Sequence, residues 1–553
     1  MNKKFLSIIF LLSLCIVFFV LCNNTIKDYS PTYDEPLHLF QGYSYLVKGS
    51  LQVVSPYDHP LLAKIISGFA LFFLSPNPVV YDNHLTWFNR QRYSFANLML
   101  YYNNNDAEVM LDTGRRAIVV FSIFFLIIFF LCINKIYNLL PASLAVILYV
   151  FNNSIIANSS LTTQDLVHAA FYFLSLYYFY FWLETKKLMY NILTGVFFAL
   201  AICSKFSAIV IVVSWCVIGF YFFVSRKTYE RVVLHFFIIN VLCLVSIVGL
   251  IYRENFFVFF SSFYETLKNL QAGRSTFFLG KYSTTGFRTY FLVLFLLKTE
   301  MSLLILFLLS VVLKFSRKKK SFLDIFVFFN IVLFFIIASF SKTQIGYRHL
   351  LPVVILVIWF VCDIVEYKKI LPLIIVVILW YIIGGVRANP LHLSYFNEVV
   401  SKRIDASKYF TDSNIDWGQG LKRLAKWIDT MPEIKKSGLY LSYFGVADPS
   451  YYRIKHKPIG IISNLVLDER RGNEVIDSEP KKIFFAVSVT NLRATYYKDK
   501  NIFDFLSEVM PVVVIGDSIF VYEITSNEVV KRKFVELLKN IGYLRDAEYI
   551  EKL

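Results

Sequence analysis

The chain has 553 residues, of which 57% are hydrophobic and 18% aromatic, and its mean hydropathy is +0.57. This composition and the long apolar runs in the sequence exclude a soluble globular protein and place the chain among polytopic membrane proteins. The net charge of +17 would suit a nucleic-acid partner, but many basic residues stand in short loops between apolar segments, so we expect no nucleic-acid binding. All seven cysteines lie in apolar segments, which leaves no C-x-x-C zinc site.

About eleven membrane helices are predicted, because the apolar runs are close to the length that crosses a hydrocarbon core. The first run begins with Lys3 and Lys4 and lacks a small-x-small cleavage site, so we interpret it as a retained helix rather than a signal peptide. The predicted spans are 5–22, 114–134, 139–157, 165–183, 189–204, 206–224, 231–251, 289–313, 321–340, 348–366 and 370–386.

The basic residues of the loops predict the orientation of these spans. With the N-terminus in the cytoplasm, every inner loop carries at least one Lys or Arg. This arrangement places loops 23–113 and 252–288, and the whole tail from Arg387, on the outer face.

The predicted loop 23–113 is long for a connector, and long loops are usually functional. Within it, segment 61–74 is apolar but too short to span, so we expect an interfacial or re-entrant helix. Segment 87–102 mixes aromatic residues with arginines, as an amphipathic surface helix does. Loop 252–288 is interpreted as a mobile lid.

After residue 386 the hydrophobic runs shorten to strand length, and helical periodicity appears between them. We predict strands at 438–445, 481–489, 511–516 and 518–524, and helices at 416–429 and 529–544. The sequence therefore predicts two domains: a membrane domain over 1–386 and an α/β domain outside the membrane over 387–553.

The segment from Tyr33 to Lys64 concentrates polar side chains at the predicted membrane surface, namely Asp34, Glu35, His38, Asp58, His59 and Lys64. Carboxylates beside a bilayer are costly unless they are solvated, paired or used. An ordinary polar loop between two spans is the alternative interpretation of these residues.

An Asp-Glu pair just after the first membrane helix, followed by the run HPLLAK, resembles the first external loop of the protein O-mannosyltransferases. It is also similar to the related bacterial polyprenyl-phosphate sugar transferases, including the aminoarabinose transferases. Leu61 stands where the family pattern has a second proline. The run YFTDSNIDWGQGLKRLAKWI at 409–428 resembles the DSN-x-DWGQ-x-LK marker of the bacterial relatives, and runs at 442–452 and 516–524 extend the match over nearly the whole chain.

The resemblance implies a polytopic α-helical membrane protein of the GT-C fold in a bacterial cytoplasmic (inner) membrane, with an extracytoplasmic C-terminal α/β domain. It implies a glycosyltransferase that moves a sugar from a polyprenyl-phosphate donor to a protein, lipid or glycan acceptor at the outer face of the bilayer. Direct use of a nucleotide sugar or ATP is disfavoured by the absence of a Walker-type loop and of a Rossmann fingerprint.

The alternative function is a non-catalytic transporter or flippase of lipid-linked glycans. A transporter more often shows repeat symmetry and polar residues near mid-membrane. Here the candidate residues gather at one face instead. A third possibility is a structural membrane component with a binding domain outside, which leaves the Asp-Glu pair and the basic cluster unexplained.

Three acids are the catalytic candidates. Asp34 is the expected base, with Glu35 beside it, because an acid at a partly dry membrane boundary can have a raised pKa that suits it to accept a proton. The resemblance gives the same role to the first acid of the pair. Asp165 lies at the outer start of the fourth span, where relatives have Thr-Asp and this chain has Gln164 before the acid. An acid that merely complements the helix dipole is the alternative for Asp165.

Several basic residues map to the outer ends of the spans, where the positive-inside rule disfavours them. Each alone could be a snorkelling side chain, but together they form a plausible site for a phosphate. The predicted phosphate-binding residues are Lys64, the adjacent Arg115 and Arg116, Lys205, Lys298 and Arg348. The predicted substrate-binding residues are His59, His349 and Tyr347. A divalent metal ion between Asp34, Asp165 and a histidine stays open.

In the DWGQ region, three polar residues are interpreted as caps of a helix that begins near Trp417, with contact to the acceptor as the alternative for Asp416. They are Asp412, Asn414 and Asp416.

Overall fold

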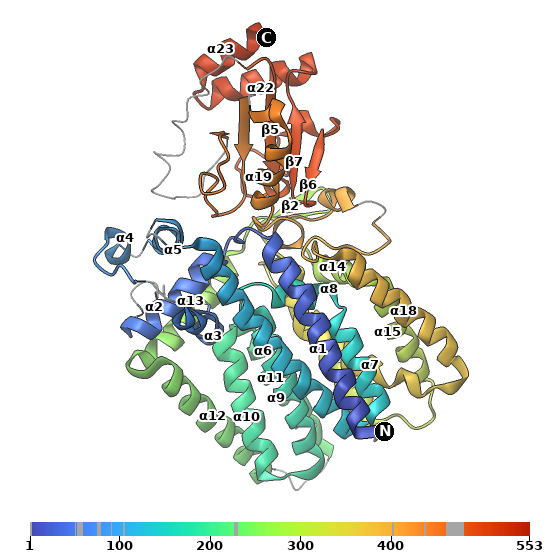
Figure 1. Ribbon diagram of the computed structural model, residues 1–553. Helices are drawn as coiled ribbons and strands as arrows, with labels where there is room; N and C mark the ends of the chain where they lie inside the picture. Colours follow the sequence, from blue (N-terminus) through green and yellow to red (C-terminus); the bar gives the residue numbers. More distant parts are fainter. Residues whose placement is uncertain are drawn as a thin grey trace.

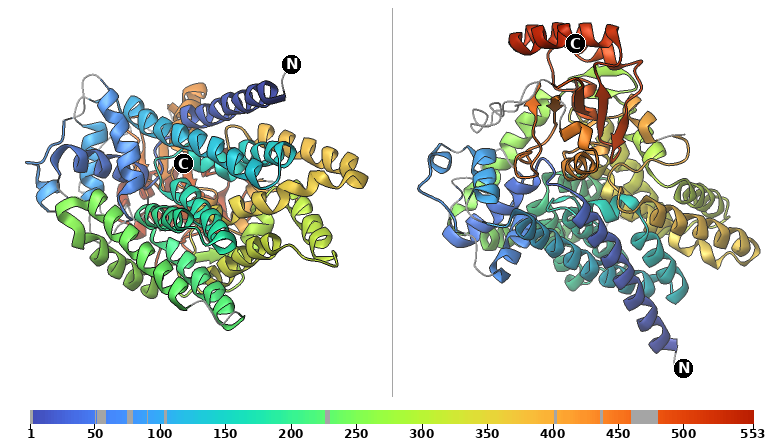
Figure 2. Two further views of the ribbon diagram at one scale, coloured as in Figure 1. Left: turned by 90° about the horizontal axis from the view of Figure 1, so that it is seen from below. Right: turned by 45° about the horizontal axis from the view of Figure 1, so that its top comes forward.

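The computed structural model describes residues 3–49, 51, 59–74, 79–89, 91–102, 105–225, 230–400, 403–435, 438–459 and 480–553. A bundle of helices carries the N-terminus at one end and a smaller α/β domain at the other end (Figure 1). The first helix, α1 (Lys3–Asp28), runs along the edge of the bundle, and its N-terminus points away from the C-terminal domain (Figure 2).

Each of the predicted spans is helical in the structure. The helices are α1, α6 (Ala107–Ile136), α7 (Leu139–Val150) with α8 (Asn153–Ser159), α9 (Asp165–Thr185), α10 (Leu188–Ser204), α11 (Ile209–Ser225), α12 (Glu230–Tyr252), α14 (Tyr290–Lys298) with α15 (Met301–Phe315), α16 (Phe322–Ser339), α17 (Leu351–Val361) and α18 (Leu371–Ala388).

Within the described ranges, seven helical segments are long and apolar enough to cross a membrane, and up to nine if each bent pair is one span. The bent pairs are α7 with α8, at 63°, and α14 with α15, at 112°. Two further predicted spans, α10 and α11, are shorter apolar helices. The polytopic helical architecture is therefore confirmed.

Burial divides the helices into a centre and a periphery. Every residue of α17 is buried, as expected for a helix that is apolar on all sides. By contrast, only 22% of the most apolar stretch of segment Lys368–Ala388, which contains α18, is buried. The corresponding share is 17% for segment Val232–Ala272, which begins in α12. Apolar side chains that stay exposed on a polytopic protein are suited to contact lipid.

The segment between α1 and α6 is mostly helical. It contains α2 (Glu35–Lys48), α3 (Leu62–Phe69), a 3-10 turn (Ala70–Phe73), α4 (Leu85–Phe88) and α5 (Arg92–Tyr101). The expected short helix at 61–74 is thus present. It crosses α2 at two glycines, because a Cβ on Gly42 would lie 1.8 Å from the Lys64 carbonyl oxygen and one on Gly68 2.3 Å from the Tyr43 nitrogen.

The predicted connection over 252–288 is largely helix and hairpin rather than an irregular loop. A 3-10 turn (Arg253–Asn255) leads from α12 directly into α13 (Phe256–Ala272), because the apolar run continues through FFVFF. An antiparallel hairpin of β1 (Thr276–Phe278) and β2 (Lys281–Ser283) follows.

The C-terminal domain is built on a five-stranded mixed sheet in the order β4-β3-β5-β7-β6. Its strands are β3 (Gly438–Ser442), β4 (Lys457–Pro458), β5 (Ile483–Ser488), β6 (Val513–Ile515) and β7 (Ile519–Glu523). β3 is parallel to β4 and β5, whereas β7 is antiparallel to β5 and β6. Four predicted strands are confirmed, while the two-residue β4 was too short to predict.

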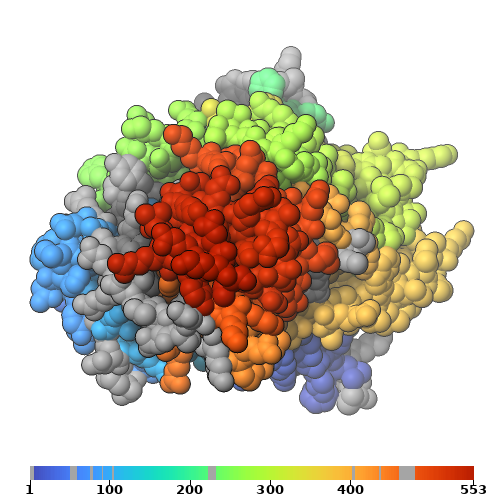
Figure 3. Space-filling view, turned by 90° about the horizontal axis from the view of Figure 1, so that it is seen from above, coloured from blue at the N-terminus to red at the C-terminus, as the bar shows by residue number. Residues whose placement is uncertain are grey.

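Helices cover both faces of this sheet, because alternate side chains of a strand point to opposite faces. On one face, Phe534 of α22 (Glu528–Asn540) packs on Tyr440 and Phe485, with ring centroids 5.2 and 5.4 Å away. On the other face, α19 (Leu421–Thr430) packs on Leu439 and Phe484. A last helix, α23 (Leu544–Lys552), was not predicted. Figure 3 shows this domain covering the middle of one end of the bundle.

Candidate active site

The loop between α1 and α2 is held against the DWGQ region by backbone contacts. The Ser30 nitrogen donates to the Gln419 carbonyl oxygen (3.1 Å), and the Tyr33 nitrogen donates to that of Trp417 (2.9 Å). The Ser30 hydroxyl donates to the Gly418 carbonyl oxygen (2.9 Å). The C-terminal domain therefore helps to place Asp34, the residue just before α2.

Asp34 stands at the N-cap position of α2, yet its carboxylate makes no capping hydrogen bond. Instead, Oδ2 accepts from Nη1 of Arg348 at 3.3 Å, and the side chain is only 20% exposed. The carboxylate is therefore directed across the site rather than at its own helix.

The pKa of Asp34 is lower than usual, so the expectation of a raised pKa is wrong. Burial by itself raises the pKa, but the positive charge of Arg348 and of nearby His38 and His59 more than offsets this effect. Asp34 is consequently ionised at neutral pH and able to accept a proton.

A second acid continues the row of charges from Asp34. Nη1 of Arg348 lies 3.8 Å from Oδ2 of Asp165, and Oδ1 of Asp165 accepts from Nζ of Lys205 at 2.6 Å. Nζ of Lys205 also lies 3.3 Å from Nδ1 of His349. The structure thus brings together five of the predicted site residues, in a cluster with alternating charges.

Local breaks in helices place these side chains. α10 ends at Ser204, and the backbone of the next residue, Lys205, turns to an extended conformation (φ −156°). Arg348 and His349 belong to a 3-10 turn (Tyr347–Leu350) preceded by Gly346. Gly346 packs closely on the C-terminal domain, because a Cβ there would lie 2.1 Å from Oγ of Ser413 and would force that side chain to move.

Trp417 covers the Arg348 guanidinium, a contact that was not predicted. The guanidinium carbon lies 3.9 Å from the indole ring centroid, and Trp417 is only 2% exposed. A guanidinium over an aromatic face is attractive, and more so when desolvated. The sequence signal that could have indicated this contact is the tryptophan within the DWGQ marker.

The interpretation of the DSN-x-D residues as helix caps is wrong. α19 begins only at Leu421, and its cap residue, Gly420, makes no side-chain hydrogen bond. Asp416 instead accepts from the Thr490 nitrogen at 3.0 Å. Asn414 accepts from the Tyr347 nitrogen at 2.9 Å and so ties the C-terminal domain to the turn that holds Arg348.

Three polar atoms of the cluster are buried without a hydrogen-bond partner among the described residues. They are Nε of Arg348, Nε2 of His349 and Oδ2 of Asp165. Buried polar groups are nearly always paired in folded proteins, so unpaired ones call for a ligand or water. Lys205 can only donate, which makes Nδ1 of His349 the acceptor and leaves the ring proton on Nε2.

Lys64 and His59 lie beside this cluster. Lys64 is buried, and its Nζ donates to the His59 carbonyl oxygen at 2.9 Å. The His59 ring lies 6.1 Å from that of His38, centroid to centroid, and both rings act on the charge of Asp34. The close α2–α3 crossing fixes this arrangement. Asp58 lies outside the described residues.

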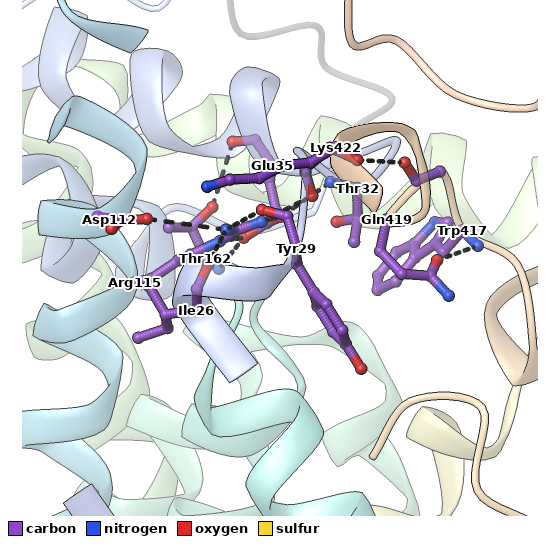
Figure 4. A network of polar contacts seen from close by, with 12 residues as sticks. Ile26, Tyr29, Thr32, Glu35, Asp112, Arg115, Thr162, Trp417, Gln419 and Lys422 are labelled. Carbon is purple, nitrogen blue, oxygen red and sulfur yellow. Dashed lines mark hydrogen bonds and ion pairs between the residues drawn. The ribbon is translucent and has the colours of Figure 1, made fainter. Parts of the chain in front are cut away.

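Glu35 and Arg115 form a separate, completely buried ion pair (Figure 4). Nε and Nη2 of Arg115 donate to the two Glu35 oxygens at 2.8 and 2.6 Å. The other donors of Arg115 are taken by the carbonyl oxygens of Ile26, Tyr29 and Ser30. All five N–H groups of Arg115 are therefore used, so we reassign Glu35 from catalysis, and Arg115 from phosphate binding, to structural roles.

Two other predicted residues also have partners that differ from those expected. Nζ of Lys298 donates to the carbonyl oxygens of Leu393 (2.6 Å), Tyr395 (3.1 Å) and Asn414 (2.6 Å), so this lysine anchors the C-terminal domain. The Tyr347 hydroxyl contacts Oγ1 of Thr299 at 2.6 Å. Neither side chain makes one of these contacts with the charged cluster around Arg348.

Arg116 follows Arg115 on α6 but points elsewhere. Its side chain is 40% exposed and pairs with Asp112 at 3.3 Å, one turn away on the same helix. It therefore belongs to the surface of α6.

Within the part of the chain that the structure describes, no group of three or more His, Cys, Asp or Glu side chains is placed to hold a metal ion. Between Asp34 and Asp165 stands the guanidinium of Arg348.

Comparisons with known proteins agree with this architecture. Residues 109–251 match the model of the dolichyl-phosphate-mannose-protein mannosyltransferase family. No curated protein matches the chain. The crystal structure of ArnT from Cupriavidus metallidurans bound to undecaprenyl phosphate is 12% identical, with a TM-score of 0.50, over 94% of this chain and 98% of that chain.

The same enzyme in the apo state also gives 12% identity and a TM-score of 0.50, over 95% of this chain and 98% of that one. The apo Archaeoglobus fulgidus oligosaccharyltransferase is 10% identical, with a TM-score of 0.46, over 88% of this chain and 70% of that one. The likeness to ArnT shows that both parts of this chain share its fold.

Proposed function

From the premise that this chain is a membrane protein of the GT-C fold, related to the dolichyl-phosphate-mannose-protein mannosyltransferases, we propose that it transfers a sugar from a polyprenyl-phosphate donor to a protein, lipid or glycan acceptor. The observation that carries this proposal is the carboxylate of Asp34. It is largely buried, takes no part in capping and stays ionised beside Arg348, which itself keeps an unpaired donor.

In the proposed reaction, the oxygen of an acceptor hydroxyl forms a bond to C1 of the donor sugar. The bond between C1 and the phosphate oxygen breaks, and polyprenyl phosphate leaves with the electron pair. Asp34 takes the hydroxyl proton. A positioned general base contributes about 10²–10⁴-fold to the rate.

The leaving phosphate is assigned to the cations and donors next to this base. Nε of Arg348 and Nε2 of His349 are buried donors without partners among the described residues, and both suit a phosphate oxygen. Lys205 and Lys64 add two buried ammonium groups. Since Arg348 contacts Asp34 as well, one guanidinium would link the base to the leaving group.

We further propose that this site faces the outside of a bacterial cytoplasmic membrane. The support is a group of predicted inner loops that contact one another at the end of the bundle that carries the N-terminus. Asn138 donates to Glu366 (2.8 Å), Arg317 contacts the Tyr367 hydroxyl, and Lys135 contacts the Tyr190 hydroxyl (3.4 Å). Gathering of basic loops at one end fits the positive-inside rule.

The activity is tested by transfer of a radiolabelled sugar from a purified polyprenyl-phosphate sugar to an acceptor extract, with the full-length protein in liposomes. Asp34→Asn should lower the rate about 10²–10⁴-fold while the protein stays folded. The control is Asp82→Asn, which removes an exposed acid paired with Lys48 and should leave the rate unchanged.

Two outcomes would contradict the proposal. Transfer by Asp34→Asn at the wild-type rate would remove Asp34 from the chemistry. Movement of the lipid-linked sugar across the liposome without any transfer by the wild type would favour the transporter. Orientation is tested separately by a reporter at the C-terminus, and a cytoplasmic signal would overturn the proposed topology.

A further inference from the structure

A cavity of about 310 Å³ lies between the C-terminal domain and the bundle. Its walls include Tyr33 from the loop before α2 and Arg274 from the segment before β1. The C-terminal domain contributes most of the rest, including Phe444, Asn491 and Tyr496. This volume is at the lower end of the range for small-ligand pockets, so it suits a compact ligand.

The position of the cavity connects it with the proposed base. Tyr33 directly precedes Asp34 in the chain, and Arg274 is close enough to act on the charge of Asp34. The donors assigned to the phosphate, Arg348 and His349, do not line the cavity. Asp34 does not line it either, so the cavity is next to the proposed catalytic site and is linked to the base through Tyr33 and Arg274.

Aromatic rings dominate one wall of the cavity. The rings of Tyr33 and Phe444 stack at 5.4 Å and 24°, and those of Phe444 and Tyr496 stack at 5.7 Å and 20°. Because the three rings stack on one another, the row presents mainly apolar ring edges to the cavity. The C–H groups on one face of a pyranose ring are also apolar and can pack against such a row, while the sugar hydroxyls point outward.

The polar groups of the cavity also favour a saccharide. Asn491 and His456 are planar polar side chains, and each is largely buried and held by a hydrogen bond: Asn491 donates to Oγ of Ser442 (3.1 Å) and Nδ1 of His456 meets the Ile454 carbonyl oxygen (3.0 Å). Rigid polar groups in small number fix the orientation of a ligand in an otherwise apolar pocket.

The charge of the cavity indicates an anionic ligand. The guanidinium of Arg274 lies 4.8 Å from the Tyr496 ring centroid, and the residue is exposed, although its charge also acts on the carboxylates of Asp34 and Asp412. None of the described residues that line the cavity is acidic. A guanidinium fork matches carboxylate and phosphate groups in geometry and charge.

A peptide fits this cavity less well. Extended peptides commonly bind by adding a strand to a free sheet edge. The edge strand beside the cavity is β4, where Pro458 has no N–H to donate. Strand addition there would lose a hydrogen bond.

We propose that this cavity is an acceptor subsite that binds one pyranose ring carrying an anionic group, with Arg274 as the partner of that group. The inference rests on the proposed glycosyl transfer, since it assigns the acceptor side of that reaction. It narrows the acceptor from a protein, lipid or glycan to an acidic saccharide, free or as part of a larger glycan.

Saturation-transfer NMR on the full-length protein in detergent tests this subsite with three probes that differ only at C6: D-glucose, D-glucuronate and D-glucose 6-phosphate. We expect saturation of the ring protons for both anionic probes, with binding at least about tenfold tighter than for glucose. Glucuronate and glucose 6-phosphate then report whether a carboxylate or a phosphate is preferred.

Two arginine variants make the test specific. Arg274→Gln should abolish the preference for the anionic probes. Arg288→Gln is the matched control, because Arg288 is also exposed and stacks on an aromatic ring, that of Phe340 at 4.1 Å, but lies outside the cavity. The control should bind as the wild type does.

An equal loss of the preference for anionic probes in both variants would overturn the subsite. The absence of saturation for all three sugars would also overturn it. Saturation of an acetylated threonine tripeptide amide in place of the sugars would replace it with a peptide site. The two proposals fail separately: sugar binding without any transfer from the donor would leave a saccharide-binding cavity but remove the proposed reaction and the acceptor role, whereas transfer without sugar binding would keep the reaction and remove the subsite.

Discussion

Replacing Glu35 by Gln should destabilise the protein rather than slow its chemistry. The Glu35 carboxylate accepts from Nε and Nη2 of Arg115 and from the backbone nitrogens of Thr32 (2.9 Å) and Thr162 (3.0 Å). Glutamine keeps one acceptor oxygen and presents an NH₂ group to donors at the other position. It also leaves the buried guanidinium of Arg115 without its counter-charge.

Breaking a buried ion pair by removing one partner costs about 3–5 kcal/mol. We expect Glu35→Gln to be near this range, because both side chains are 0% exposed and solvent cannot replace the lost bonds. The control is Asp112→Asn, which removes only the partly exposed Arg116 contact at 3.3 Å and a longer one of 3.9 Å to Arg115. That change should cost less than about 1 kcal/mol.

The assay follows unfolding of the detergent-solubilised protein by tryptophan fluorescence, alongside sugar transfer per folded molecule. Glu35→Gln should lower the unfolding temperature clearly, and the folded fraction should keep a transfer rate far above that of Asp34→Asn. An unchanged unfolding temperature together with a rate loss as large as that of Asp34→Asn would refute this reasoning and return Glu35 to the catalytic machinery.

Three further changes probe the site and its attachment to the C-terminal domain. Arg348→Gln removes the charge that lowers the pKa of Asp34 while burial remains, so the acid limb of kcat/KM against pH should move to higher pH; an unmoved limb would contradict this electrostatic role. Lys298→Met leaves three buried carbonyl oxygens without this donor, at a cost of about 1–3 kcal/mol each, and limited proteolysis should then separate the two domains more readily. Burial raises the pKa of Asp416 to about 7. The stability that the protonated Asp416 contributes is therefore fully present below its unfolded pKa of about 4 and is lost as the pH rises through 7. The loss is up to about 1.4 kcal/mol per pH unit. Asp416→Asn should flatten this dependence in thermal melts taken from pH 4 to 8.

The helices and most strands of this chain could be predicted because their signals are local. An apolar run of membrane length predicts a helix, and a short apolar run predicts a strand, from the residues of that run alone. The same argument explains the errors. The apolar run beyond residue 252 continued as α13, and the two residues of β4 were too few to carry a pattern.

The candidate site was only partly predictable. Asp34, Asp165, Lys205, Arg348 and His349 were all selected from the sequence, and the structure brings them together. Trp417, which covers Arg348, was missed because an aromatic residue ahead of a helical pattern is ordinarily part of a core.

The sequence by itself determined that this chain is a polytopic membrane protein with a terminal α/β domain, and that charged residues gather at one end of its helices. Only the tertiary structure decided which of those charges are chemically available. Asp34 and Glu35 are neighbours, yet a helix turns successive side chains about 100° apart, so one faces Arg348 and the other Arg115. Because each partner comes from a distant part of the chain, no local pattern distinguishes the proposed base from the structural acid beside it.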